Sequence, residues 1–428
     1  MISKKLYKLA QKIFPIHRSI TGEGVRKTLN IFRKINPELI IKEIPSGKKA
    51  FDWTVPPEWK IDEAYIVTPK GKKICDIKKN NLHIISYSTD VDLILSYKEL
   101  IKKLHSLPSQ PNAIPYRTSY YEDLWGFCIT DNEKKKLEKK GKYKVFIKSK
   151  KFKGVLNYGE AYIKGESNKE VLISTYICHP SMANNEVSGP TVSTYLLNYI
   201  KRKKRKFSYR FVFIPETIGS IAFLSLNYKK LKKDVIAGFN ISCIGDEKNY
   251  SYLPSRRGDT LSDKIAQNAL KSCDNKFKKY QWFDRGSDER QYCSPGIDLP
   301  IASIMRTKYG EYKEYHTSLD KLGTVVTAKG LFGGYTAVKK AIDIMEANQV
   351  PKAMLKCEPF MSKRNLYPTT SSGTSNTKYI KSYMDILAFA DGKYSLVDIA
   401  DICDQDFFYI LGLAKKLESK KLIKLKDL

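Results

Sequence analysis

Two short segments of this chain hold the residues best suited to chemistry, although they lie far apart in the sequence. The first is Cys178-His-Pro-Ser181, and the second runs from Gly310 to Asp320 and reads Gly-Glu-Tyr-Lys-Glu-Tyr-His-Thr-Ser-Leu-Asp. The chain has five histidines, and these segments contain His179 and His316. Neutral imidazole is the commonest protein ligand for transition metals. Because each histidine lies among small, polar and acidic residues downstream of an apolar run, the pair predicts a metal site.

The elements that must position these segments form an alternating pattern from about residue 160 onward. Strands are expected in the apolar runs and helices in the stretches between them, with a long closing helix near the end. This alternation predicts a doubly wound α/β sheet, which places its sites at the carboxyl ends of the strands. The expected strands lie at 171–177, 209–214, 235–244 and 301–305, and the expected helices at 192–200, 221–228 and 331–347.

The remaining patterns divide the chain into five parts. The first part is helical, the second is a small β-rich domain with short runs broken by turns, and the third is the α/β domain. A Ser-, Thr- and Gly-rich linker follows, and then a compact helical pattern ending in a short strand, which predicts a winged helix. The predicted bounds are 1–50, 51–160, 161–360, 361–377 and 378–428.

The composition excludes some classes of protein. The 428 residues are 42% hydrophobic, as in a globular protein of two or three domains, and contain no apolar run long enough to span a bilayer. The lysine-containing N-terminus lacks an apolar signal core, so a cytoplasmic protein is expected. The eight cysteines form no C-x-x-C pair, which favours reduced, buried thiols. The net charge of +31 comes from lysines spread along the whole chain, which favours solvated faces over a nucleic-acid-binding patch.

Five strings together resemble the zinc aminopeptidase superfamily, which includes di-zinc aminopeptidases, glutamate carboxypeptidases and glutaminyl cyclases. More closely, the chain is similar to bacterial proteins with an aminopeptidase-like domain. In those proteins a β-rich domain interrupts the peptidase fold, a winged helix follows, and a link to polysaccharide biosynthesis is common. The resemblance covers nearly the whole chain and implies an α/β fold with a mixed sheet of zinc-exopeptidase type. The strings lie at Cys178–Pro190, Pro215–Ser220, Cys243–Asp246, Arg285–Tyr292 and Tyr315–Asp320.

The resemblance assigns roles to three residues. It implies that His179 and His316 are metal ligands and that Glu216 is the general base, which would move a proton from a water molecule to the leaving amine. Structural alternatives remain open for two of these residues. His179 can be a capped histidine at a strand end, and Glu216 can be stabilised at a helix N-terminus by the helix dipole.

The chain departs from the family pattern at three ligand positions. Asn185 stands where the family has a bridging Asp, Thr217 where it has a second Glu, and Ser242 where it has a ligand Asp. The nearest carboxylates that can substitute are Glu186 and Asp246. Because three anionic ligands are missing, we expect one zinc ion per chain, held by the two histidines and one or two carboxylates, with Fe or Mn as alternatives.

The segment Arg285–Tyr292 matches the part of the family fold that shapes the substrate pocket. Asp288 is expected to orient a ligand histidine, and Arg285 or Arg290 to hold a substrate carboxylate. Asn185 and Tyr312 complete the expected substrate-binding set. The alternative is an Arg–Asp network that only holds the loop.

The predicted winged helix is not expected to bind nucleic acid. From Lys378 onward the chain carries nine Lys against eight Asp and Glu, a net charge of +1, whereas DNA affinity depends on phosphate neutralisation. A homodimer contact or a protein-docking role is therefore expected.

Three hypotheses for the function follow. The first is a zinc-dependent, aminopeptidase-like hydrolase that cleaves an amide bond of a short peptide or an N-acylated small molecule, in surface polysaccharide biosynthesis. The second is a non-catalytic, metal-binding scaffold that assembles through the winged helix. The third is a DNA-binding regulator, and it is the weakest because the predicted winged helix has a net charge of only +1.

Overall fold

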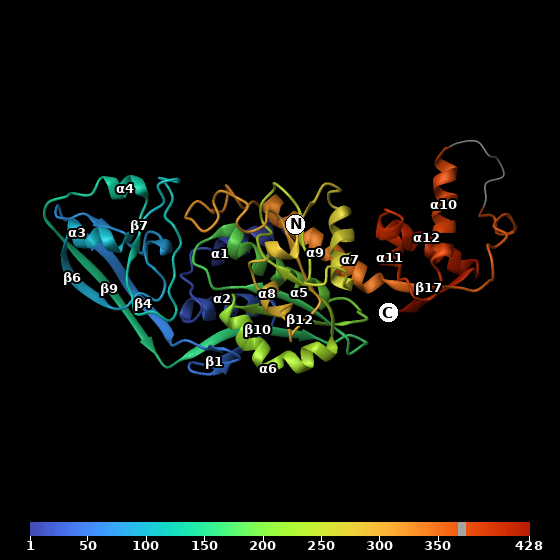
Figure 1. Ribbon diagram of the computed structural model, residues 1–428, viewed down its shortest axis with the longest axis horizontal. Helices are drawn as coiled ribbons and strands as arrows, with labels where there is room; N and C mark the ends of the chain where they lie inside the picture. The colour runs from blue at the N-terminus through green and yellow to red at the C-terminus, as the bar shows by residue number, and fades with distance from the viewer. Residues whose placement is uncertain (367–373) are drawn as a thin grey trace.

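The computed structural model describes residues 1–366 and 374–428 and shows an elongated molecule built in three parts (Figure 1). A small β-rich part lies at one end, a large central sheet with helices in the middle, and a helical part at the other end. Residues 367–373 of the predicted linker lie outside the described residues. The division of the chain into five domains stays a prediction.

The central sheet has eight strands in the order β1-β10-β12-β11-β13-β16-β14-β15. The four strands β12, β11, β13 and β16 are parallel. On one side β10 runs antiparallel to β12, and β1 runs antiparallel to β10; on the other side β14 runs antiparallel to β16. The predicted mixed α/β sheet is therefore confirmed. Its strands are β1 (Ile40–Pro45), β10 (Val155–Ile163), β11 (Glu170–Tyr176), β12 (Ser208–Ile214), β13 (Val235–Ile241), β14 (Ser251–Leu253), β15 (Lys278–Lys279) and β16 (Ile301–Met305).

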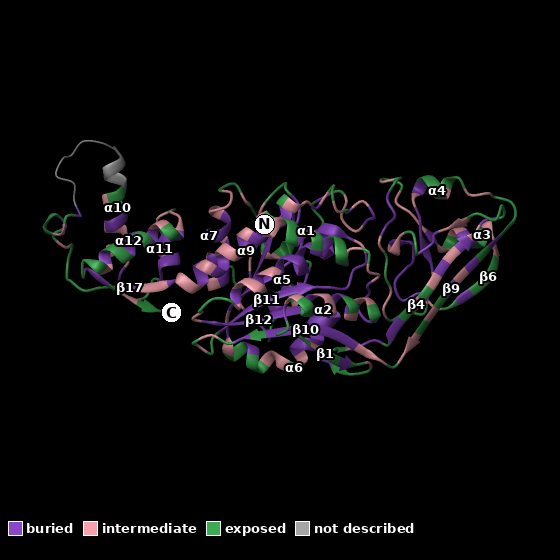
Figure 2. Cartoon of the chain, turned by 180° about the vertical axis from the view of Figure 1, so that it is seen from behind, coloured by how far each residue is buried: buried purple, intermediate pink, exposed green. Residues whose placement is uncertain are grey.

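The central strands form because their sequences suit burial on both faces. Every residue of β11 and β12 is buried, and Figure 2 shows these strands in the colour of buried residues. Parallel strands covered by helices on both sides read as continuous apolar runs, as Val171-Leu-Ile does here. This rigid centre fixes the loops that follow the carboxyl ends of the strands.

Helices cover both faces of the sheet. On one face α1, α5, α7 and α9 pack against one another, and α2 packs beside α5 and β10. On the other face α6 packs together with α8 (Figure 1). The bounds are α1 (Ile2–Ile13), α2 (Glu23–Ile35), α5 (Ser188–Ile200), α6 (Ile218–Asp234), α7 (Leu261–Lys271), α8 (Glu289–Tyr292) and α9 (Ala328–Ala347).

The β-rich part is built around a four-stranded sheet in the order β5-β4-β9-β6. It is inserted between two neighbouring strands of the central sheet, because it begins after β1 and its last strand, β9, is followed by β10. The bounds are β2 (Lys49–Ala50), β3 (Trp53–Thr54), β4 (Glu58–Val67), β5 (Lys73–Ile74), β6 (Val91–Ser96), α3 (Tyr97–Leu100), β7 (Leu104–His105), β8 (Phe127–Cys128), α4 (Asp131–Lys135) and β9 (Lys142–Phe152).

The C-terminal part contains three helices and a two-stranded sheet, the arrangement expected of a winged helix. Strand β18 pairs antiparallel with β17, which directly follows α9, and α11 packs on α7 of the central domain. Within the described part of the chain, no helix has the length and apolarity needed to cross a membrane. The bounds are β17 (Gln349–Ala353), α10 (Thr374–Ala388), α11 (Leu396–Ile402), α12 (Phe407–Ser419) and β18 (Ile423–Asp427).

Candidate active site

His179 lies three residues beyond the end of β11 and is almost fully buried. Its Nδ1 lies 2.9 Å from Oε2 of Glu186, and its Nε2 lies 3.6 Å from Oε2 of Glu216. Glu186 belongs to a single π-helical turn, Ala183–Val187, that leads into α5. A carboxylate on Nδ1 orients the ring and leaves the Nε2 lone pair for a ligand, as in many metal sites.

A buried arginine completes this row of charges. The Arg18 guanidinium, from the connection between α1 and α2, places its Nε 3.4 Å from Oε1 of Glu186, and both side chains are 1% exposed. The Nη1 group of Arg18 also donates to the carbonyl of Ile13 at 2.6 Å. Arg18 therefore neutralises Glu186 and fixes its position beside His179.

Protonation of His179 follows from the same contacts. Burial by itself would lower its pKa, but the Cys178 thiol and Glu186 outweigh burial, and the pKa lies well above the usual range. Burial raises the pKa of the Cys178 thiol to about 11, although the neighbouring His179 opposes that rise.

Glu216 follows the end of β12 at the start of α6. Its Oε1 accepts a hydrogen bond from the Ser287 hydroxyl at 2.7 Å, and its backbone N–H points to the Cys178 sulfur at 3.2 Å. Burial raises the pKa of Glu216, although His179 and Ser287 oppose that rise. The side chain keeps 21% of its surface exposed. A carboxylate with a raised pKa and access to solvent is suited to accept and donate a proton near neutral pH.

His316 lies beside His179, and their ring centroids are 5.5 Å apart. Its backbone has a positive φ of 54°, and its ring stacks on Tyr315 at 3.9 Å. The buried Nε2 has no hydrogen-bond partner among the described residues. Burial, together with His179, lowers the pKa of His316 to about 3, so the imidazole is neutral and has a lone pair available.

The β-rich part contributes a wall to this site. The Tyr116 ring packs 5.2 Å from the His179 ring and 5.3 Å from the His316 ring. The backbone holds it there, because Tyr116 N–H donates to the carbonyl of His316 and Ser318 N–H donates to that of Ile114, each at 2.9 Å. Sequence reasoning missed Tyr116, since no local pattern connects it with residues so far along the chain.

Asp320 holds the two histidine-bearing loops together. Its carboxylate accepts from the backbone N–H groups of Asn184 and Asn185, at 2.8 and 3.0 Å, and from the Tyr312 hydroxyl at 3.1 Å. Burial raises the pKa of Asp320 to about 6. Tyr312, expected to bind substrate, is thus a buried partner of Asp320.

The structure does not bring Asp246 into the cluster. Its oxygens accept four hydrogen bonds, from the Asn184 amide, the Lys248 N–H, and the N–H and hydroxyl of Thr307. A carboxylate satisfied in this way fixes loops, and it has no oxygen directed at His179 or His316. The expectation that Asp246 replaces the ligand missing at Ser242 therefore receives no support from the geometry.

Asn185 does lie at the site. Its Oδ1 accepts from the Tyr176 hydroxyl at 3.1 Å, and its buried Nδ2 has no partner among the described residues. The Tyr176 ring also packs 5.3 Å from His179. A neutral amide here, where two cations would need a bridging carboxylate, argues against a two-metal centre.

The predicted substrate-binding loop contains one buried residue, Asp288, and two exposed arginines, Arg285 and Arg290. Asp288 is fully buried and accepts from the Thr217 N–H and the Ser220 hydroxyl, each at 2.8 Å. It therefore supports the Glu216 turn and does not contact a histidine. Arg290 is exposed and donates to the Thr217 hydroxyl, next to Glu216, whereas Arg285 stacks on Trp282 at the surface.

The available donors fit one transition-metal ion better than two. Cys178, His179 and Glu186 are the only three such side chains in the described residues whose ligand atoms lie within 4.8 Å of one another. A cation there would meet the Arg18 guanidinium and a neutral thiol, which disfavours that position. On the other side of the ring, His179 Nε2 faces Glu216, and the unpartnered Nε2 of His316 supplies a third donor. Two histidines and a carboxylate form a common zinc ligand set.

Comparison with known proteins gives two family matches. The family described as "Domain of unknown function (DUF4910)" matches residues 7–348, and a "winged helix-turn-helix" family matches residues 349–425. A Clostridium acetobutylicum protein is 42% identical over 422 residues, which cover 98% of this chain and 96% of the relative. That protein is provisionally named a polysaccharide biosynthesis protein with an aminopeptidase-like domain.

Solved structures give the same fold. A crystal structure of a provisionally named peptidase from Clostridium acetobutylicum matches with a TM-score of 0.91 and 41% identity, covering 99% of this chain and 96% of that one. A zinc aminopeptidase from Bacillus subtilis matches with a TM-score of 0.58 and 14% identity, covering 79% and 94%. A peptidase M28 precursor from Shewanella amazonensis matches with a TM-score of 0.55 and 12% identity, covering 84% and 98%.

Proposed function

Because the chain belongs to the DUF4910 family and shares the fold of zinc aminopeptidases, we propose that it is a zinc-dependent amide hydrolase. The observation that supports this proposal most strongly is the meeting of three groups from the loops that follow three strands, β11, β12 and β16. His179 Nε2 faces the Glu216 carboxylate at 3.6 Å, and the neutral His316 beside them has an unpartnered nitrogen. A purely structural cluster would satisfy that nitrogen.

We assign the ion to His179 and His316, with Glu216 or Asn185 completing its ligands. Zinc bound there would supply Lewis acidity for a substrate carbonyl. Glu186 acts on the opposite side of the His179 ring, where it keeps Nδ1 protonated and the ring in place. Glu186 is therefore reassigned from a metal ligand to a positioning residue in this proposal.

Glu216 is the proposed proton carrier. Its carboxylate would accept a proton from an attacking water molecule and pass the proton to the amine that leaves when the amide bond breaks. The Ser287 hydroxyl holds one oxygen of Glu216 and leaves the other directed toward His179. The raised pKa of Glu216 favours both halves of this proton transfer at neutral pH.

The proposed substrate is a short peptide or an N-acylated small molecule. Tyr116, Tyr176 and Tyr315 pack around the two histidines, so a substrate there would meet aromatic rings on several sides. The exposed guanidinium of Arg290 beside Glu216 is placed to meet a substrate carboxylate. The name of the Clostridium acetobutylicum relative supports a role in polysaccharide biosynthesis.

The proposal is tested first by metal content. Elemental mass spectrometry on the purified protein should find about one zinc per chain, and His316→Ala should lose most of it while keeping a wild-type circular dichroism spectrum. His105→Ala, at a histidine of the β-rich part outside the site, is the matched control and should retain the metal.

The second test is activity. With aminoacyl anilides and N-acetyl amino sugars as substrates, Glu216→Gln should lower kcat by about 100-fold or more. The zinc content of the variant, measured in parallel, separates loss of the proton carrier from loss of the ion. If the wild-type protein binds no stoichiometric metal even after zinc is supplied, the hydrolase proposal is wrong.

A non-catalytic scaffold is the second candidate function, and one observation favours it. Asn185, Thr217 and Ser242 remove three anionic ligands from the positions that the family resemblance assigns to them. In that case the winged helix would serve assembly with a second copy or another protein. Metal binding without turnover of any amide substrate would support this candidate.

A further inference from the structure

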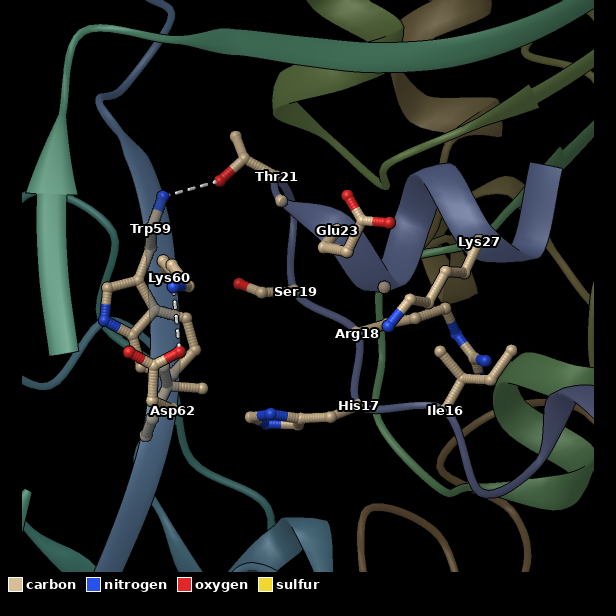
Figure 3. Close-up of a pocket in the computed structure, with 13 residues that line it drawn as sticks. Ile16, His17, Arg18, Ser19, Thr21, Glu23, Lys27, Trp59, Lys60 and Asp62 are labelled. Carbon is tan, nitrogen blue, oxygen red and sulfur yellow. Dashed lines mark hydrogen bonds and ion pairs between the residues drawn. The ribbon is translucent and has the colours of Figure 1, made fainter. Parts of the chain in front are cut away.

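A separate cavity of about 380 Å³ lies between the connection from α1 to α2, the first turn of α2 and the start of β4 (Figure 3). Neither His179, Glu216 nor His316 lines this cavity. It lies where the β-rich part meets the central domain, and the function proposed above gives it no role.

In the connection from α1 to α2, successive side chains point alternately toward the cavity and away from it. Figure 3 shows His17 and Ser19 pointing across the cavity toward β4, while Arg18 points away from it, the direction in which it meets Glu186. The Ser19 side chain is 6% exposed, and its hydroxyl has no partner among the described residues; Nε2 of His17 also lacks one there. Buried polar groups are costly without a partner, so this wall is suited to a polar ligand.

The start of α2 adds backbone donors to the same wall. The first N–H groups of a helix have no partner within the helix, and the N-cap residue here, Gly22, provides no side chain to cap them. Glycine is required at this position because φ is 96° and a Cβ would come within 2.7 Å of the Trp59 carbonyl oxygen. An uncapped helix N-terminus carries partial positive charge and favours anions.

The charged side chains around the cavity leave one cation available. Lys60 pairs with Asp62 at 3.0 Å, and Glu23 pairs with Arg26 at 3.0 Å. Lys27 lines the cavity and makes no ion pair with any described residue. Both carboxylates that line the cavity have a cationic partner, although Glu23 shares Arg26 with Glu58. Lys27 adds a positive charge that no ion pair occupies among the described residues.

We propose that this cavity binds a small anionic ligand, whose phosphate or carboxylate group is held by the N-terminus of α2, the Ser19 hydroxyl and Lys27. A water molecule takes about 30 Å³, and an inorganic phosphate is only a few times larger than a water molecule. The cavity therefore has room for a phosphate group and for further atoms attached to it. The anionic group therefore belongs to a small polar molecule such as a sugar phosphate, whose remaining atoms lie between His17 and Lys60.

Isothermal titration calorimetry at constant ionic strength tests this inference, with inorganic phosphate, glucose 1-phosphate, glucuronate and glucose as probes. Glucose 1-phosphate should bind saturably at about one per chain, and inorganic phosphate more weakly. Glucuronate binding would identify a carboxylate as the anionic group, and glucose should not bind. Ser19→Ala and Lys27→Met should each weaken binding by about tenfold.

Two control variants make the result specific. Lys34→Met removes an exposed lysine at the other end of α2 and should leave affinity unchanged. His316→Ala should also leave it unchanged, which separates this cavity from an anion bound at the proposed metal centre. The inference is wrong if no anionic probe binds, if glucose binds equally well, or if Ser19→Ala and Lys27→Met both bind like wild type.

Discussion

At the scale of single residues, the carboxyl group of Asp288 beside Glu216 shows how burial changes the pKa of a group in the site. Burial, with Glu216 close by, raises the pKa of Asp288 to about 8. One oxygen accepts two hydrogen bonds, from Thr217 and Ser220, and the other has no partner among the described residues. The folded protein therefore holds Asp288 protonated at pH values where the unfolded chain has already lost the proton.

This protonation predicts a pH-dependent stability. Between about pH 4 and 8 the folded state binds one more proton at Asp288 than the unfolded state, so the free energy of unfolding falls as pH rises. Asp288→Asn preserves the accepting oxygen and cannot ionise. Its Tm, measured from pH 5 to 8, should therefore decrease less with rising pH than that of wild type; equal slopes would contradict the assignment.

The same scale shows what sequence reasoning can recover. His179 and His316 could be proposed from the apolar strands that precede them, because parallel strands end at one edge of a sheet. The role of Glu216 was implied by the family resemblance. Asp246 also follows a strand, but sequence does not reveal that Asn184, Lys248 and Thr307 occupy its oxygens. Whether each predicted residue acts in catalysis stays a prediction.

At the scale of elements, segments distant in sequence complete the site. The Ala113–Thr118 segment of the β-rich part pairs with the loop that carries His316, through hydrogen bonds in both directions. Arg18 arrives from the connection between two N-terminal helices. No local sequence pattern predicts the contact of this segment with the His316 loop or the contact of Arg18 with Glu186. The adjacent His17 and Arg18 between two amphipathic helices are the one feature that could have indicated a functional connection.

The Tyr116 contact gives a prediction for this scale. Tyr116→Ala removes a ring that touches both histidines, and it should lower the free energy of unfolding by about 2–3 kcal/mol, less than for a fully buried aromatic. Tyr116→Phe keeps the ring and should be nearly neutral, since the contact of the hydroxyl with the Tyr120 hydroxyl is long, at 3.5 Å. Urea denaturation of both variants measures the difference, and equal losses would show that the hydroxyl carries the contact.

At the scale of the whole molecule, the winged helix is fastened to the central domain. The Asn268 side chain on α7 donates to Asp401 at 3.0 Å and accepts from the Phe407 N–H at 3.1 Å. Lys264 on the same helix pairs with Asp398 at 2.6 Å. These contacts fix the C-terminal helices against α7, so that the molecule is extended but continuous (Figure 1).

Loss of this junction should be detectable. Asn268→Leu leaves the buried Phe407 N–H without its partner and removes the amide that donates to Asp401, which should cost about 2 kcal/mol. Limited proteolysis should then cut faster near residues 388–396, between α10 and α11. Asn227→Leu, on α6 and far from the winged helix in sequence, is the comparison and should leave that cleavage rate unchanged.

The ion pair between Arg18 and Glu186 also bears on how the protein is made. Arg18 leaves the ribosome early, but its carboxylate partner is synthesised only after the whole β-rich part, and His316 emerges later still. The N-terminal helices therefore cannot settle into their final packing during the first stage of translation. A shortened chain that begins at α2 would leave Glu186 and His179 without the cation that anchors them.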